Sequence, residues 1–91
     1  MFEFDLSDEL KALLRQLGKK DRALAEAVKK KVREIVSRDA ETIDGYKNLR
    51  APLNEFKRAH VGNFVLTFKI YRERNFVFFH SLRHHDEAYK I

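Results

Sequence analysis

The chain has 91 residues, of which 44% are hydrophobic and 36% are charged, with a formal net charge of +5 and no cysteine. This length suits one domain over residues 1–91, and the lack of cysteine excludes disulfides and thiolate metal sites. No apolar run approaches the roughly 18 residues of a membrane span, and the acidic start MFEFDLSDEL is unlike a secretory signal. We therefore expect a cytoplasmic protein without membrane association.

The positive charge lies in the C-terminal half of the chain. Residues 1–45 carry ten basic and ten acidic side chains, whereas residues 46–91 carry nine basic and four acidic ones. All four histidines and nine of the eleven aromatic residues also lie in this second half. A basic and aromatic surface suits a polyanion, and RNA in particular when the surface is small.

The first half predicts a short strand and a helical hairpin. Residues 2–6 alternate apolar and polar side chains, so the apolar ones are expected to face a core. Ser7 is a good helix N-cap, apolar residues then recur at helical spacing up to Leu17, and Gly18 is expected to end this helix. Asp21 is expected to cap the second helix.

The second half predicts a long loop and three strands. Residues 39–54 lack periodicity, and a loop of this length usually has a function or a partner. A period of two then indicates strands over residues 58–61, 64–70 and 76–79, with turns between them. The element order is typical of an α+β fold, with a helical hairpin on one face of a mostly antiparallel four-stranded sheet.

The alternation also predicts which side chains share the uncovered face of the sheet. Ala59 and Val61 must face the helices, so Arg58 and His60 point to the opposite side. The next strand and the C-terminal tail bring further side chains to this face, namely Val65, Thr67, Lys69, Arg83, His84, His85 and Tyr89. The sequence therefore predicts arginine, histidine and tyrosine side chains around one shallow surface.

Other kinds of site are less well supported. The adjacent His84 and His85 point apart in a helix or a strand, and no carboxylate-rich cluster surrounds them, so we expect no metal. We interpret His80, at the end of an apolar strand, as a structural residue that hydrogen-bonds its neighbours. No serine lies in a nucleophile elbow, and no glycine-rich phosphate loop is present, so we expect no cofactor.

The predicted surface suits metal-free cleavage of RNA. The substrate supplies its own nucleophile, the 2′-hydroxyl. Histidine or tyrosine can act as general base and general acid. Arginine or lysine can hold the phosphate and stabilise the charge of the transition state.

The segment YKNLRAPLNEFKRAHVGNFVLTFKI, followed by RHHDEAY, resembles the RelE/ParE toxin superfamily in an archaeal-type branch. The resemblance extends over residues 1–91 and implies the β-α-α-β-β-β fold of these toxins. It also implies a type II toxin that cleaves messenger RNA on the ribosome and inhibits translation. The implied partner is an acidic antitoxin from the same operon, and we expect the 39–54 loop and the groove around the helices to bind it.

The resemblance implies roles for individual residues. It implies catalytic roles for His60, Arg83, His85 and Tyr89, and contacts to RNA phosphates for Arg58 and His84. We also expect Lys57 and Lys69 to contact RNA phosphates. The superfamily usually has an arginine at the position of Val65. This departure motivates one alternative, a decayed member that binds RNA without cleaving it. A second alternative is a ParE-like toxin that binds DNA gyrase and cuts nothing, because the same fold can carry either role.

Overall fold

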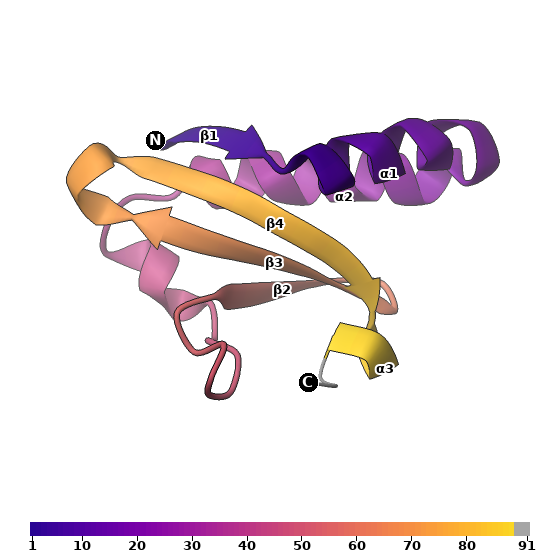
Figure 1. The fold of residues 1–91 in the computed structure, drawn as a ribbon. Coiled ribbons are helices and arrows are strands. Elements are labelled where there is room, and N and C mark those ends of the chain that lie inside the picture. Colours follow the sequence, from indigo (N-terminus) through magenta and orange to yellow (C-terminus); the bar gives the residue numbers. More distant parts are fainter. Residues whose placement is uncertain (89–91) are drawn as a thin grey trace.

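A four-stranded sheet carries a helical hairpin on one face in the computed structural model, which describes residues 1–88 (Figure 1). The elements in chain order are β1 (Glu3–Leu6), α1 (Asp8–Lys20), α2 (Arg22–Val36), the 3-10 helix η1 (Thr42–Gly45), β2 (Lys57–Val61), β3 (Phe64–Tyr71), the 3-10 helix η2 (Arg72–Arg74), β4 (Phe76–His84) and α3 (His85–Ala88). The strand order is β1-β4-β3-β2, in which β1 runs parallel to β4 and the other pairs are antiparallel. The expected α+β fold is confirmed.

The helical hairpin begins as expected but turns at a different residue. The Ser7 hydroxyl accepts a hydrogen bond from the Leu10 N–H at the start of α1. The expected helix end at Gly18 is wrong, because α1 continues to Lys20. Asp21 makes the break, since its own N–H closes α1 and its carboxylate caps α2. Within residues 1–88, these helices and the shorter ones are too short or too polar to cross a membrane.

The core lies between the sheet and the two helices. Its fully buried members include Leu10, Val28, Ile35, Ile43, Leu66, Phe68, Val77 and Phe79. Phe2 also belongs to the core, whereas the expected burial of Phe4 is wrong, because its side chain is 47% exposed. β1 is an edge strand, so the ring of Phe4 contacts that of Phe79 at 6.1 Å and stays open on its outer side.

The turns between the last three strands occur where they were expected. Gly62 joins β2 to β3 with a φ of 59°, a left-handed conformation that glycine adopts without steric cost. Asn75 precedes β4 with a φ of 50°, and asparagine is one of the few other residues that tolerate this region. These turns bring three consecutive strands into one antiparallel ladder.

A β-bulge interrupts the ladder between β3 and β4. Thr67 pairs with Ser81 and the next residue of β3 pairs with Phe79, so His80 has no partner on β3. The His80 carbonyl accepts a hydrogen bond of 2.7 Å from the Ser7 hydroxyl, which ties the bulge to the start of α1. A bulge of this kind changes the direction of a side chain relative to the regular alternation.

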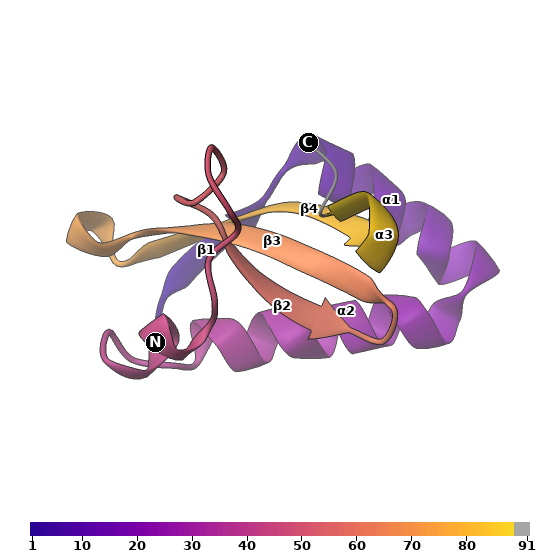
Figure 2. The same ribbon diagram turned by 90° about the horizontal axis from the view of Figure 1, so that it is seen from below.

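The segment between α2 and β2 is a loop with one short 3-10 helix. The Asp39 carboxylate accepts hydrogen bonds from the backbone N–H of Thr42 at 2.8 Å and from its hydroxyl at 3.0 Å. These bonds hold the pKa of Asp39 below its ordinary value. An ion pair between Asp44 and Arg72 joins the loop to η2. The rest of the loop projects from the sheet on the side of α3, opposite the helical hairpin (Figure 1, Figure 2).

Candidate functional site

The face of the sheet opposite α1 and α2, here called the open face, carries side chains in rows across the strands. The register joins His60 on β2, Val65 on β3 and Arg83 on β4 into one row. The adjacent row consists of Arg58, Thr67 and Ser81. Arg58 and His60 are therefore on the face that the alternation predicted, and Arg83 reaches the row of His60 from the other side of β3.

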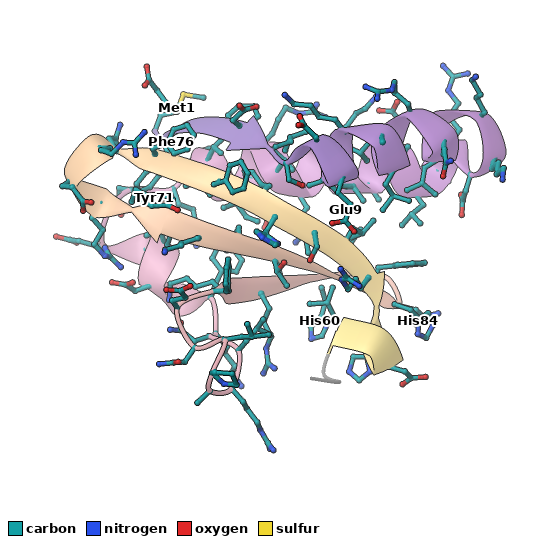
Figure 3. The ribbon with its side chains drawn as sticks, in the orientation of Figure 1. Met1, Glu9, His60, Tyr71, Phe76 and His84 are labelled. Atoms are coloured by element: carbon teal, nitrogen blue, oxygen red, sulfur yellow. The ribbon has the colours of Figure 1, made fainter. Side chains whose placement is uncertain are left out.

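α3 brings a second histidine to the first row. The ring of His85 stacks on that of His60, with 5.8 Å between the centroids and 28° between the planes. The His85 N–H donates a 2.8 Å hydrogen bond to the Asn63 carbonyl, which ties the start of α3 to the turn between β2 and β3. Figure 3 shows His60 pointing away from the helical hairpin toward α3. Both histidines are exposed, so a ligand can reach them.

Two arginines flank the stacked histidines. Nη2 of Arg83 lies 3.5 Å from Oε1 of Glu9 in the first turn of α1, and these side chains are 50% and 67% exposed. An exposed ion pair of this kind is screened by water and contributes little stability, so an anionic ligand can compete with Glu9. Arg58 is partly buried, and its backbone N–H donates to the Lys47 carbonyl at 2.9 Å.

Small and uncharged side chains form the floor between these groups. Val65 is fully buried although it does not belong to the core under the helices. Thr67 and Ser81 are 7% and 5% exposed, and their hydroxyl oxygens are 2.6 Å apart. Val65 is the position at which the RelE/ParE superfamily usually has an arginine. Here this position is part of an apolar floor, and the cationic side chains of Arg58 and Arg83 come from the strands on either side.

Lys57 does not join the other expected phosphate-binding residues. It pairs with Phe68, whose side chain belongs to the core, and its own side chain is only 13% exposed. Its ammonium donates to the Tyr46 carbonyl at 3.1 Å and to Oδ1 of Asn48 at 2.8 Å. The structure thus uses Lys57 to hold the loop against β2.

His84 and Lys69 also lie away from the stacked histidines. His84 ends β4 on the other side from Arg83, and its ring contacts that of Phe64 at 5.6 Å (Figure 3). Lys69 is on the open face but farther along β3, where its ammonium lies 3.3 Å from the Glu55 carboxylate. Tyr89 lies outside the described residues, so the structure does not test its expected position.

One histidine on the open face was missed by the reasoning from sequence. His80, interpreted as a structural residue, is exposed, and its ring contacts those of Phe56 and Phe78. The bulge that turns it to this face has no clear signal in the sequence. Within residues 1–88, no three histidine or acidic side chains are grouped so that they could hold a metal ion.

A groove of about 370 Å³ follows the outer edge of β2. It is lined by α2, the loop and the strand, through Lys31, Gly45, Tyr46, Lys47, Arg58, Ala59 and His60. Three of these side chains are cationic and none is acidic. The groove therefore suits an extended anionic chain, and it shares Arg58 and His60 with the rows of the open face.

No protein-family model matches the chain. It is similar to a Methanocaldococcus jannaschii protein named "Putative toxin RelE4", with 38% identity over 91 residues that cover 99% of this chain and 93% of that protein. A metal-bound toxin from Helicobacter pylori has the same fold, with a TM-score of 0.72 and 24% identity over 96% of this chain and 98% of that one. A chain of the E. coli RelBE toxin–antitoxin complex aligns with a TM-score of 0.69 and 19% identity, over 92% and 96%.

Proposed function

Because this chain belongs to the RelE family of toxins from toxin–antitoxin systems, we propose that it is an endoribonuclease that cleaves messenger RNA on the ribosome. Its action would inhibit translation in the cytoplasm. The observation that carries this proposal is the stack of His60 and His85 on the open face. Arg83 lies in the row of His60 and Arg58 in the adjacent row, so two imidazoles and two guanidiniums lie on neighbouring rows of one face.

The reaction needs no cofactor, because RNA carries its own nucleophile. The 2′-hydroxyl loses its proton and its oxygen bonds to phosphorus, while the bond from phosphorus to the 5′-oxygen breaks and that oxygen takes up a proton. The products are a 2′,3′-cyclic phosphate and a 5′-hydroxyl. In this proposal His60 and His85 carry out the two proton transfers, and Arg58 and Arg83 stabilise the negative charge of the transition state. Tyr89 remains a further candidate by resemblance.

A second candidate function is RNA binding without cleavage. The observation that favours it is Val65, which is buried and uncharged where the superfamily usually has an arginine. The two arginines at the sides of the floor support cleavage instead, because they can hold a phosphate without a cation beneath it. RNA binding without cleavage is therefore the alternative that the experiment must exclude.

We further propose that an acidic antitoxin from the same operon inhibits the toxin by occupying the groove at the edge of β2. Lys31, Lys47 and Arg58 line this groove, and carboxylates of an extended chain would complement their charge. The similar fold in the E. coli toxin–antitoxin complex supports a partner of this kind. Because the groove shares Arg58 and His60 with the proposed catalytic site, the antitoxin would compete directly with RNA.

The test is to map RNA ends after brief induction of the full chain in cells, and again with purified chain and one messenger RNA with and without ribosomes. Ends that carry a 5′-hydroxyl are distinguished from 5′-phosphate ends because they accept a label from polynucleotide kinase without prior dephosphorylation. We expect new 5′-hydroxyl ends within translated regions, and only when ribosomes are present. The variant with His60→Gln and His85→Gln should produce none.

The other outcomes identify the alternatives. Intact messenger RNA together with salt-dependent RNA binding would indicate a member that binds without cleaving. Intact messenger RNA together with DNA damage would indicate a gyrase-directed toxin. Cleavage that persists in the double histidine variant would show that the proton-transfer groups lie elsewhere.

A further inference from the structure

A second group of rings lies on the open face, apart from the stacked histidines. The ring centroid of His80 is 5.1 Å from that of Phe56 and 6.2 Å from that of Phe78, and both contacts are edge-on. His80 is exposed, and the two phenylalanines are partly buried. These three residues, here called the ring cluster, have no role in the proton transfers or the phosphate contacts proposed above.

Backbone hydrogen bonds hold the ring cluster in place. His80 is the unpaired residue of the bulge in β4, and its carbonyl accepts the Ser7 hydroxyl at 2.7 Å. The Phe56 N–H donates to the Leu53 carbonyl at 3.0 Å, and the Phe56 carbonyl accepts the Leu49 N–H at 2.9 Å. Because these bonds position the rings before any ligand arrives, binding at the cluster would cost little ordering entropy.

Cationic side chains connect the ring cluster to the proposed catalytic site. Phe78 pairs with Lys69, which is two residues along β3 from Thr67 in the row of Arg58. Val65, in the row of the stacked histidines, is two residues farther along β3, so four residues of the strand, or roughly 13 Å, separate that row from Lys69. This span corresponds to about two steps between neighbouring nucleotides in an extended chain. A strand of RNA with one phosphate at the stacked histidines therefore has a base one or two nucleotides away within reach of the cluster.

We propose that the ring cluster is a stacking site for an unpaired base of single-stranded RNA, one or two nucleotides from the scissile phosphate. Proteins that bind single-stranded RNA stack its bases on aromatic and histidine rings, and such stacking accepts any base because every base has a π-face. The inference rests on the proposed function, since it assumes that RNA occupies the open face. It gives the exposed His80 a role in substrate binding and leaves catalysis to His60 and His85.

Because Phe56 and Phe78 are partly buried, the test varies the exposed ring of His80. The probe is a short fluorescein-labelled RNA with 2′-O-methyl groups, which cannot be cleaved, and its binding to the purified full chain is measured by fluorescence anisotropy at low salt. His80→Ala should weaken binding about 5- to 150-fold, the range of stacking one base, and His80→Phe should retain it. Phe4→Ala removes an exposed ring from the other side of the sheet and should change nothing.

An abasic version of the same probe separates stacking from charge. It should bind the wild type and His80→Ala equally, because it has no base to stack. Equal binding of the base-containing probe by both proteins would overturn the proposal, and so would an equal loss with both probes. A loss of antitoxin capture without a loss of RNA binding would assign the cluster to a protein contact and would also overturn it.

The stacking site and the proposed function can fail separately. If the wild type produces 5′-hydroxyl ends on ribosomes but His80→Ala binds the probe as tightly as the wild type, only the stacking site is wrong. If His80 is needed for probe binding but no RNA ends appear, the stacking site stands and the nuclease proposal is wrong. Failure of the wild type to bind the probe at all would overturn the stacking site.

Discussion

His60 and His85 stack with 5.8 Å between their ring centroids, although one lies near the end of β2 and the other begins α3. The contact depends on the turn at Gly62, which pairs β2 with β3, on the antiparallel pairing of β3 with β4, and on the bond from the His85 N–H to the Asn63 carbonyl. Two imidazoles held side by side on an exposed face can supply the base and the acid that the proposed cleavage of RNA requires.

The first prediction concerns this pair. Replacing either histidine, as His60→Ala or His85→Ala, should lower the rate of messenger RNA cleavage on ribosomes by about 10²- to 10⁴-fold, the usual contribution of one general acid or base. The double variant should be little worse than the poorer single variant, because the two groups act in one reaction. The rate is measured from the appearance of new 5′-hydroxyl ends.

A third histidine provides the control for this series. His84 lies on the other side of β4, and its Nδ1 accepts the Asp86 N–H at 3.3 Å. In His84→Asn the amide oxygen can accept the same bond, so α3 should keep its position and cleavage should stay near the wild-type rate. A loss as large as that of His85→Ala would show that the adjacent histidines act together and that the assignment to His85 alone is wrong.

The fold could be predicted from the sequence because its signals are local. The alternation of polar and apolar residues gave the strands, Gly62 gave the turn, and the placement of Arg58 and His60 on the open face followed from the period of two. The prediction that α1 ends at Gly18 was wrong because a glycine inside a helix only weakens the helix. Asp21, in contrast, both closes α1 and caps α2.

The parts of the site that were missed depend on tertiary structure. Lys57 is next to Arg58 in the chain, but the alternation that turns Arg58 to the open face turns Lys57 to the loop and the core. The direction of His80 depends on a bulge held by a bond to Ser7, a residue far away in the chain. The exposure of Phe4 depends on its strand being at the edge of the sheet.

The second prediction compares the two neighbouring cations of β2. Arg58→Ala should weaken RNA binding and lower the slope of log K against log salt by about 0.7, the value for one phosphate contact to a single strand. Lys57→Ala should leave this slope unchanged, because its ammonium binds the loop. The slopes are measured by titrating the uncleavable probe at several salt concentrations. Equal slopes for Arg58→Ala and the wild type would remove Arg58 from the phosphate contacts.

The third prediction concerns acid stability and Asp39. Hydrogen bonds from the backbone and then the hydroxyl of Thr42 lower the pKa of Asp39 in the folded state. The ionised group therefore stabilises the fold above its ordinary pKa of about 3.9, and this contribution is lost as the pH falls through the lower folded-state pKa. Asp39→Asn should unfold at lower urea than the wild type at pH 7, and the difference should shrink below about pH 4. A difference that stays constant down to acid pH would contradict this.

The fourth prediction concerns the buried hydroxyl pair in the floor of the open face. Thr67→Val and Ser81→Ala each leave one hydroxyl without its partner at 2.6 Å, which should cost about 1–3 kcal/mol in the free energy of unfolding. Ser81→Ala should cost less, because the Thr67 hydroxyl keeps the Ser81 carbonyl at 3.5 Å. The double variant should lose less stability than the sum of the two single variants, and urea unfolding of all four proteins measures this coupling.

The folded double variant should still cleave RNA, because these hydroxyls are too buried to contact the substrate. Loss of cleavage in a stable double variant would instead make the floor part of the catalytic site.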